Sequence, residues 1–153
     1  MNDSDIRAVL LTNFGQEYGN DPNTMIVEEL GLCQGEARVD VAVINGSIHG
    51  FEIKSDQDTL KRLPGQMNIY NRSLDFVTLV VGGRHLTKSL EIIPKWWGVI
   101  CVQQRNKKLI MDDIRPHKAN PSPDPEAIVQ LIWRNEALEV LRRRNLHKGY
   151  LSK

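Results

Sequence analysis

Apolar and polar residues alternate along two neighbouring stretches of the chain, residues 38–44 and residues 48–54. A period of two is typical of a β-strand that buries one of its faces. Asn45, Gly46 and Ser47 separate the two stretches, and Asn-Gly is the strongest short signal for a hairpin turn. The pattern therefore predicts a β-hairpin, with Gly46 or Ser47 in a left-handed bulge position.

The length of the hairpin loop decides which side chains share a face of the sheet. A two-residue loop would place Asp40 opposite Phe51 and send Glu52 to the other face. A three-residue loop places Asp40 directly opposite Glu52, with Lys54 on the same face. We predict the three-residue loop, because it gathers the apolar side chains on the opposite face: Val39, Val41, Val43, Phe51 and Ile53.

The remaining elements follow from their own periodicities. Helical spacing of apolar residues predicts helices over residues 4–14, 60–74, 87–93 and 125–146. In the second of these, Pro64 is expected in a first turn. Short apolar, β-branched runs predict strands over residues 76–81, 99–102 and 107–111, the last two joined by a turn at Arg105-Asn106. The segment 25–32 is ambiguous between a helix end and a strand.

The length and composition indicate one ordinary globular domain. We predict a single domain over residues 1–153, in which residues 117–125 link the body to a docked C-terminal helix. No apolar run approaches the roughly 20 residues that span a bilayer. The acidic, polar N-terminus is unlike a signal peptide, so we expect a cytoplasmic protein with no membrane partner. Cys33 and Cys101 are expected to be buried free thiols, with a disulfide as the alternative.

The net charge of +1 conceals a difference between the two halves of the chain. Residues 1–83 carry 6 Lys/Arg and 12 Asp/Glu, whereas residues 84–153 carry 14 Lys/Arg and 7 Asp/Glu. A basic half suits a protein that meets nucleic-acid phosphates. The alternative is that folding mixes the halves and leaves no charged patch.

The predicted register brings two acids together. Carboxylates directly opposite each other on antiparallel strands have Cβ atoms roughly 5 Å apart. For Asp40 and Glu52 this means that one carboxyl group is protonated or that a cation lies between them. Oxygen ligands of this kind suit Mg²⁺ or Mn²⁺. The alternative is a surface strand with ordinary charges, in which Lys54 neutralises one acid.

These residues resemble a known catalytic core. Asp40, followed by Glu52-Ile53-Lys54, is similar to the core of the PD-(D/E)XK nuclease superfamily, in which an upstream helix often carries a further Glu. Glu29 stands in the place of that acid, and Glu28 is the competing candidate.

The resemblance extends downstream of this core. Residues 51–63 resemble a family of small stand-alone bacterial and phage members of the superfamily, and Gln66-x-x-x-Tyr70 is similar to a motif of RecB-type nucleases. One departure is Val39, which stands where many members have Pro.

The resemblance implies a fold and a role for each residue. It implies an α/β fold with a restriction-endonuclease-like core, a central mixed sheet flanked by helices in the order α-β-β-β-α-β. Asp40, Glu52 and the Ile53 carbonyl would hold Mg²⁺ or Mn²⁺, Glu29 would support the metal, and Lys54 would assist the attacking water. The residues implied to place the substrate are Gln66, Tyr70, Lys61 and Arg62.

The predicted function is therefore a Mg²⁺-dependent deoxyribonuclease, with an endonuclease favoured over an exonuclease and DNA as the partner. The alternative is a non-catalytic DNA- or protein-binding module on the same fold, for example a phage or defence-system interaction protein. A homodimer and a protein partner both remain open at this point.

Overall fold

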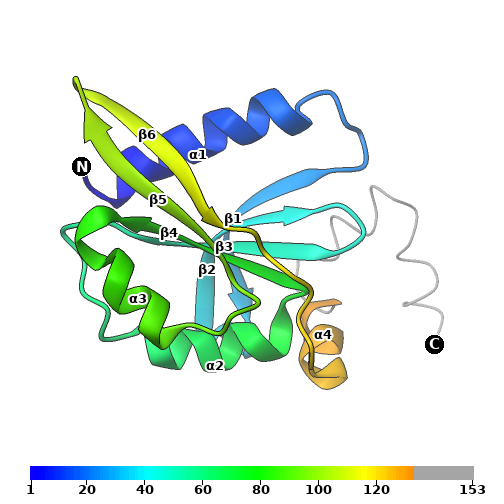
Figure 1. Cartoon of the computed structure of the whole chain (residues 1–153). Helices are drawn as coiled ribbons and strands as arrows, with labels where there is room; N and C mark the ends of the chain where they lie inside the picture. The colour runs from blue at the N-terminus through cyan, green and yellow to red at the C-terminus, as the bar shows by residue number, and fades with distance from the viewer. Residues whose placement is uncertain (133–153) are drawn as a thin grey trace.

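A six-stranded mixed sheet forms the centre of the molecule, in the computed structural model that describes residues 1–132 (Figure 1). The strands lie in the same order in the sheet as in the chain. They are β1 (Met25–Leu32), β2 (Ala37–Ile44), β3 (Ile48–Lys54), β4 (Phe76–Gly82), β5 (Gly98–Arg105) and β6 (Lys108–Arg115). The helices are α1 (Asp3–Tyr18), α2 (Leu63–Ser73), α3 (Leu86–Ile92) and α4 (Pro125–Ile132), with short 3₁₀ turns at Cys33–Gly35 and Gly83–His85.

Strand direction divides the sheet into three zones. The first three strands are antiparallel neighbours, β3, β4 and β5 run parallel, and β6 returns antiparallel to β5. Parallel strands need a crossover, and here α2 connects β3 to β4 while α3 connects β4 to β5. Central strand β4 is buried along nearly its whole length, in keeping with its continuous apolar sequence.

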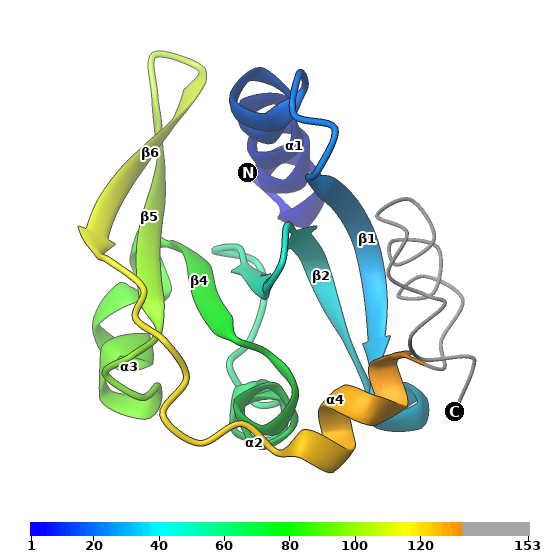
Figure 2. The ribbon, with the colours of Figure 1, turned by 90° about the vertical axis from the view of Figure 1, so that its right-hand side faces the viewer.

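The two faces of the sheet bury separate cores. On one face α1 contributes Ile6, Leu10 and Phe14, which pack with side chains of β2 to β5. On the other face α2 contributes Leu63 and Tyr70, and Trp97 joins them below α3. Figure 2 shows α1 on one side of the sheet and α2 and α3 on the other. The α/β fold with a mixed sheet flanked by helices is therefore confirmed, and the first six helices and strands follow the predicted order.

The hairpin between β2 and β3 has the predicted three-residue loop. Ile44 pairs with Ile48 and Ala42 pairs with Gly50, and Gly46 has a φ of 102°, the left-handed conformation that favours glycine. The register prediction is wrong beyond this point. Pairing ends at Val41 and Phe51, so Asp40 and Glu52 are not ladder partners.

The predicted grouping of apolar side chains also needs one correction. Val41, Val43, Phe51 and Ile53 share the α1 face, but Val39 belongs to the core under α2. The alternation therefore shifts by one side chain around Asp40, where β2 separates from β3.

Several element predictions differ in detail. The ambiguous segment 25–32 is strand β1, and α1 begins at Asp3, one residue before the predicted start, with Asn2 capping it through a reciprocal capping box with Asp5. The β5–β6 turn is Asn106-Lys107, one residue later than predicted. Pro64 lies in the first turn of α2 as expected.

The segment predicted as a linker is hydrogen-bonded to the body. The Asn120 side chain donates to the carbonyls of Asn71 (2.7 Å) and Leu74 (2.8 Å), and the Asp124 amide donates to the Arg72 carbonyl (2.8 Å). The predicted helix over residues 125–146 begins as α4, and its part beyond residue 132 lies outside the described residues. Cys33 and Cys101 are buried free thiols, as expected. Within residues 1–132, the helices lack the length and apolar character needed to cross a membrane.

Candidate functional site

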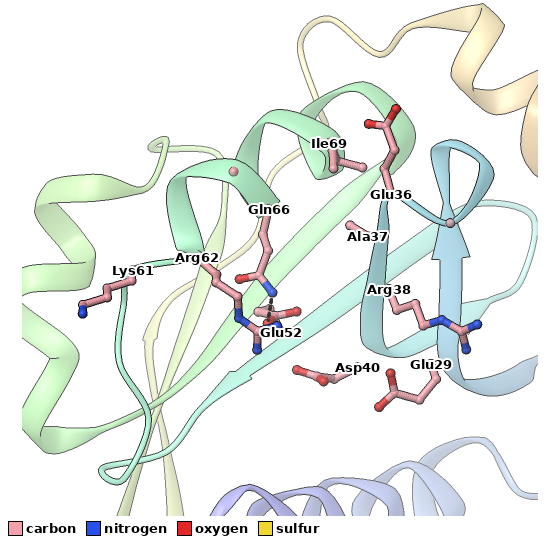
Figure 3. A pocket seen from close by; sticks show the side chains of 12 residues that line it. Glu29, Glu36, Ala37, Arg38, Asp40, Glu52, Lys61, Arg62, Gln66 and Ile69 are labelled. Carbon is pink, nitrogen blue, oxygen red and sulfur yellow. Dashed lines mark hydrogen bonds between the residues drawn. The ribbon is translucent and has the colours of Figure 1, made fainter.

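A cleft of about 680 Å³ opens between α2 and strands β1 to β3 (Figure 3). It lies where β2 and β3 cease to pair, so the strands themselves leave the opening. Most of the residues predicted as a site line it. The lining residues are Glu29, Gly35, Glu36, Ala37, Arg38, Asp40, Glu52, Lys61, Arg62, Gly65, Gln66 and Ile69.

Asp40 bridges the separated strands at the floor of this cleft. Its Oδ2 accepts a hydrogen bond from the backbone amide of Ile53 (2.7 Å), which takes the place of a ladder bond. Its Oδ1 accepts from Nη2 of Arg7 (3.0 Å). Burial and the nearby charge of Glu52 nevertheless raise the pKa of Asp40 to about 7. The carboxyl group therefore titrates near neutral pH.

Arg7 is the cation that gathers the acids of the cleft. It reaches from α1 to the sheet, where it pairs with Glu29 (2.9 Å), Asp40 (3.0 Å) and, at longer range, Glu28 (3.8 Å). It also contacts Asp3 one turn earlier on α1 (3.4 Å). Together, these acids raise the pKa of Arg7 although burial lowers it. A side chain of the protein thus provides the positive charge that the sequence suggested a metal would supply.

Glu29 points into the cleft because the backbone of β1 is irregular at this residue. Its φ is 53°, which is uncommon for a residue with a side chain, and the pairing of β1 with β2 skips it. Glu28 is more exposed than Glu29 and does not line the cleft. Of the two candidate upstream acids, Glu29 is the one placed beside Asp40 (Figure 3). Such local strain is frequent at functional sites.

Glu52 is buried and fully engaged by three donors. Its Oε1 accepts from Nζ of Lys54 (3.0 Å) and Nε2 of Gln66 (2.9 Å). Its Oε2 accepts from the hydroxyl of Tyr70 (2.6 Å), which also lies 3.1 Å from the Arg38 carbonyl. Burial and the charge of Glu52 raise the pKa of Tyr70 above its usual value, so Tyr70 stays a hydrogen-bond donor.

Lys54 belongs to this buried network. Its side chain is 4% exposed and pairs with Glu52 rather than facing the open cleft. Oε1 of Gln66 is buried, and no donor in residues 1–132 bonds to it. The motif residues 52, 54, 66 and 70 therefore come together as one polar cluster, in which Glu52 and Gln66 line the cleft and Lys54 and Tyr70 lie behind them.

The rim of the cleft carries positive charges, in contrast to its acidic floor. Arg38, Lys61 and Arg62 are exposed, and among the described residues no ion pair or hydrogen bond engages their side chains. We call these three residues the cationic rim. In Figure 3 the Arg62 side chain extends toward Gln66 and Glu52, while Lys61 points outward. Among the acids that line the cleft, Glu36 is the one whose side chain has no ion-pair or hydrogen-bond partner in residues 1–132.

Sequence reasoning missed Arg7, Arg38 and Glu36. Arg7 lies 33 residues before Asp40, and no local pattern joins α1 to β2. A possible signal was an arginine beside the apolar stripe of α1, at a position able to reach the sheet. Arg38 could have been noted from its strand neighbour, since it lies two residues before Asp40.

The predicted metal ligands are arranged differently from a metal site. Both oxygens of Asp40 and both oxygens of Glu52 accept hydrogen bonds from protein donors. Glu29 is paired with Arg7. Within residues 1–132, no group of three or more His, Cys, Asp or Glu side chains is arranged to hold a metal ion. This donor set does not fit a metal as it stands, and binding of Mg²⁺ or Mn²⁺ stays a prediction.

Comparison with known proteins points away from nucleases. The chain is similar to "Protein cII" of Enterobacteria phage P4, with 36% identity over 84 residues, which cover 55% of this chain and 32% of that relative. The aligned stretch thus spans about a third of the relative's length. No solved structure matches the chain.

A family model gives the same result over the full length. The family described as Bacteriophage P4 protein cII matches residues 1–153. The predicted membership of the PD-(D/E)XK superfamily is therefore wrong, and so is the predicted assignment as a Mg²⁺-dependent deoxyribonuclease. The short motif D…ExK misled because its side chains are bonded within the protein, Asp40 to Arg7 and the Ile53 amide and Glu52 to Lys54. The phage origin considered for the alternative agrees with this match, and the chain belongs to the bacteriophage P4 cII protein family.

Proposed function

We propose that this protein is a non-catalytic phage regulatory protein that acts by binding DNA, with the cationic rim as a contact to the phosphate backbone. The observation that carries the proposal is the contrast within the cleft. The carboxylates of Asp40 and Glu52 are occupied by internal donors, whereas the three cations of the rim have no partner in the described part of the chain.

The internal pairing supports a binding role over a chemical one. A residue that assists an attacking water must be able to reach it, but Lys54 is buried and paired with Glu52. Tyr70 is fully buried, so its hydroxyl serves Glu52 and not an incoming molecule. The cluster holds α2 against β3 and so supports the cationic rim.

The charge arrangement supports an anionic partner. Arg7 and Lys54 offset the acids of the floor, and a pKa of about 7 leaves Asp40 partly neutral at physiological pH. The rim then presents Arg38, Lys61 and Arg62 to solvent. Exposed Lys and Arg side chains gain most by replacing the counterions of a phosphate backbone.

The test is DNA binding by a triple rim variant. Wild type and Arg38→Ala/Lys61→Ala/Arg62→Ala are titrated into fluorescent duplex DNA in EDTA, and anisotropy is recorded at several salt concentrations. The rim variant should bind at least about tenfold more weakly, and the salt slope should fall by about 0.9 for each phosphate that is no longer neutralised.

A matched control removes the same charge elsewhere. Lys88, Lys95 and Lys118 are exposed and distant from the cleft lining, so Lys88→Ala/Lys95→Ala/Lys118→Ala carries an identical change in net charge. This control should bind close to wild type. Equal losses of affinity in both triple variants would reduce the effect to net charge and contradict a role for the rim. A folded wild type that binds no DNA would redirect the search to a protein partner.

A further inference from the structure

The end of the β5–β6 hairpin is a two-stranded ribbon that projects past the rest of the sheet (Figures 1 and 2). Pairing of β4 with β5 stops at Gly82 and Val102, whereas β5 and β6 continue to pair as far as Arg105 and Lys108. Beyond Val102, each strand of the ribbon pairs with the other and with no further strand of residues 1–132. Leu109 anchors one side by packing against the core under α1.

Three cations crowd the last four residues of this ribbon. Arg105 and Lys108 are direct cross-strand partners, and Lys107 lies in the turn between them. Like charges directly opposite each other destabilise a hairpin. All three side chains are exposed, and none forms an ion pair with a described acid. We call residues 105–108 the hairpin tip.

The turn itself is unfavourable for one of its two residues. Asn106 and Lys107 have φ values of 51° and 63°, the left-handed conformation that a type I′ hairpin turn requires at both of its central residues. Asn is well suited to this conformation, but glycine is the favoured residue at the second position. A lysine there is strained, so the sequence gives up stability and adds a charge at the tip.

The residues behind the tip extend the polar surface. Gln103 and Gln104 are exposed, and Oε1 of Gln103 accepts a hydrogen bond from Nη2 of Arg105 (3.0 Å), which orients the guanidinium group. Gln, Asn, Arg and Lys are the side chains that hydrogen-bond base edges and phosphates, and a two-stranded β-ribbon fits the major groove of B-form DNA.

We infer that the hairpin tip inserts into a groove of double-stranded DNA, where Arg105, Lys107 and Lys108 contact phosphates on either side. An anionic partner between Arg105 and Lys108 converts their repulsion into attraction, which accounts for an otherwise destabilising pair. This inference rests on the proposed DNA-binding function and names the element that enters the duplex.

The most direct test uses Lys107→Gly. Glycine relieves the left-handed strain and removes one cation, so stability and affinity should move in opposite directions. The midpoint of thermal unfolding should rise, while the dissociation constant for a fluorescent duplex should increase about threefold or more. A second variant, Arg105→Gln/Lys108→Gln, should bind at least about tenfold more weakly. Its salt slope should be lower by about 2, because each neutralised phosphate accounts for about 0.9 of the slope.

Two comparisons make the outcome decisive. The control Lys88→Ala/Lys95→Ala carries the same charge change as the double tip variant and should bind as wild type. Tip variants that bind as wild type, while the triple rim variant is impaired, would overturn this inference and leave the proposed function standing. Loss of binding in the control as great as in the tip variant would also overturn it. Failure of the wild-type chain to bind duplex DNA would overturn both.

Discussion

The acids at the floor of the cleft are paired with cations of the protein itself. Asp40 and Glu52 lie close enough for the charge of Glu52 to raise the pKa of Asp40, so the two negative charges repel each other. The structure resolves this repulsion with two protein cations. Arg7 pairs with Asp40, and Lys54 pairs with Glu52. Because a buried ion pair needs both partners, each pair constrains what its members can be replaced by.

We expect the Glu52–Lys54 pair to contribute to the free energy of unfolding. Lys54→Met should lower the free energy of unfolding by about 3–5 kcal/mol, because it leaves the Glu52 charge buried without its cation. The double variant Glu52→Gln/Lys54→Met should recover most of this loss, since no charge then remains to be buried. Urea denaturation of wild type, both single variants and the double variant measures the coupling.

Additive losses in that cycle would contradict this explanation. They would mean that Glu52 and Lys54 act independently, as they would if Lys54 were held by something other than Glu52. Lys88→Met, at an exposed position on α3, is a suitable control for replacing a lysine with methionine.

The raised pKa of Asp40 predicts that the stability of the fold depends on pH. Because the folded protein holds the proton of Asp40 up to about pH 7, the stability that this proton contributes is full below the unfolded pKa near 3.8 and is lost as pH rises through about 7. Asp40→Asn removes this dependence. The free energy of unfolding of the variant, taken relative to that of wild type, should therefore be higher at pH 8 than at pH 5.

Denaturant titrations of wild type and Asp40→Asn at both pH values measure the difference. The half-buried His49, whose pKa is lowered to about 3 by burial and by His117, acts in the opposite direction, but it is common to both proteins and cancels. A difference that stays constant with pH would show that Arg7 and the Ile53 amide keep Asp40 ionised.

At the scale of elements, local patterns sufficed for most of the fold. The β2–β3 loop followed from Asn-Gly, the start of α2 from Pro64, and β4 from its apolar sequence, because each signal acts within a few residues. The segment 25–32 stayed ambiguous because the alternation in β1 breaks at Glu29, where the backbone turns left-handed. A glutamate at that position gives no sequence signal for such a break.

The site could be predicted only in part, for the same reason. The spacing of Asp40, Glu52, Gln66 and Tyr70 brought the correct residues together, but their bonding depends on contacts between distant elements. Arg7 reaches Asp40 from another helix, and the separation of β2 from β3 turns Asp40 toward Ile53. A motif read without these partners therefore suggested metal chemistry.

At the scale of the whole molecule, Lys88, Lys95 and Lys118 are exposed cations at scattered positions. Among the described residues, six further cations without an ion pair form two groups of three. One is the cationic rim between α2 and β2, and the other is the hairpin tip beyond the opposite side of the sheet. The acids at the cleft floor are paired internally, as the ion pairs of Arg7 and Lys54 illustrate. Two separated cationic surfaces on one rigid sheet suit contact with an extended anionic partner such as duplex DNA.

The central proposal is that this protein binds DNA without cutting it, and that this binding does not require a metal. The most direct measurement is titration of a fluorescent duplex in Mg²⁺, in Mn²⁺ and in EDTA at matched ionic strength, with the same DNA then examined on a denaturing gel. We expect the same affinity in all three conditions and DNA that remains intact. Cleavage that depends on the metal and disappears in Glu52→Ala, or binding that EDTA abolishes, would contradict the claim.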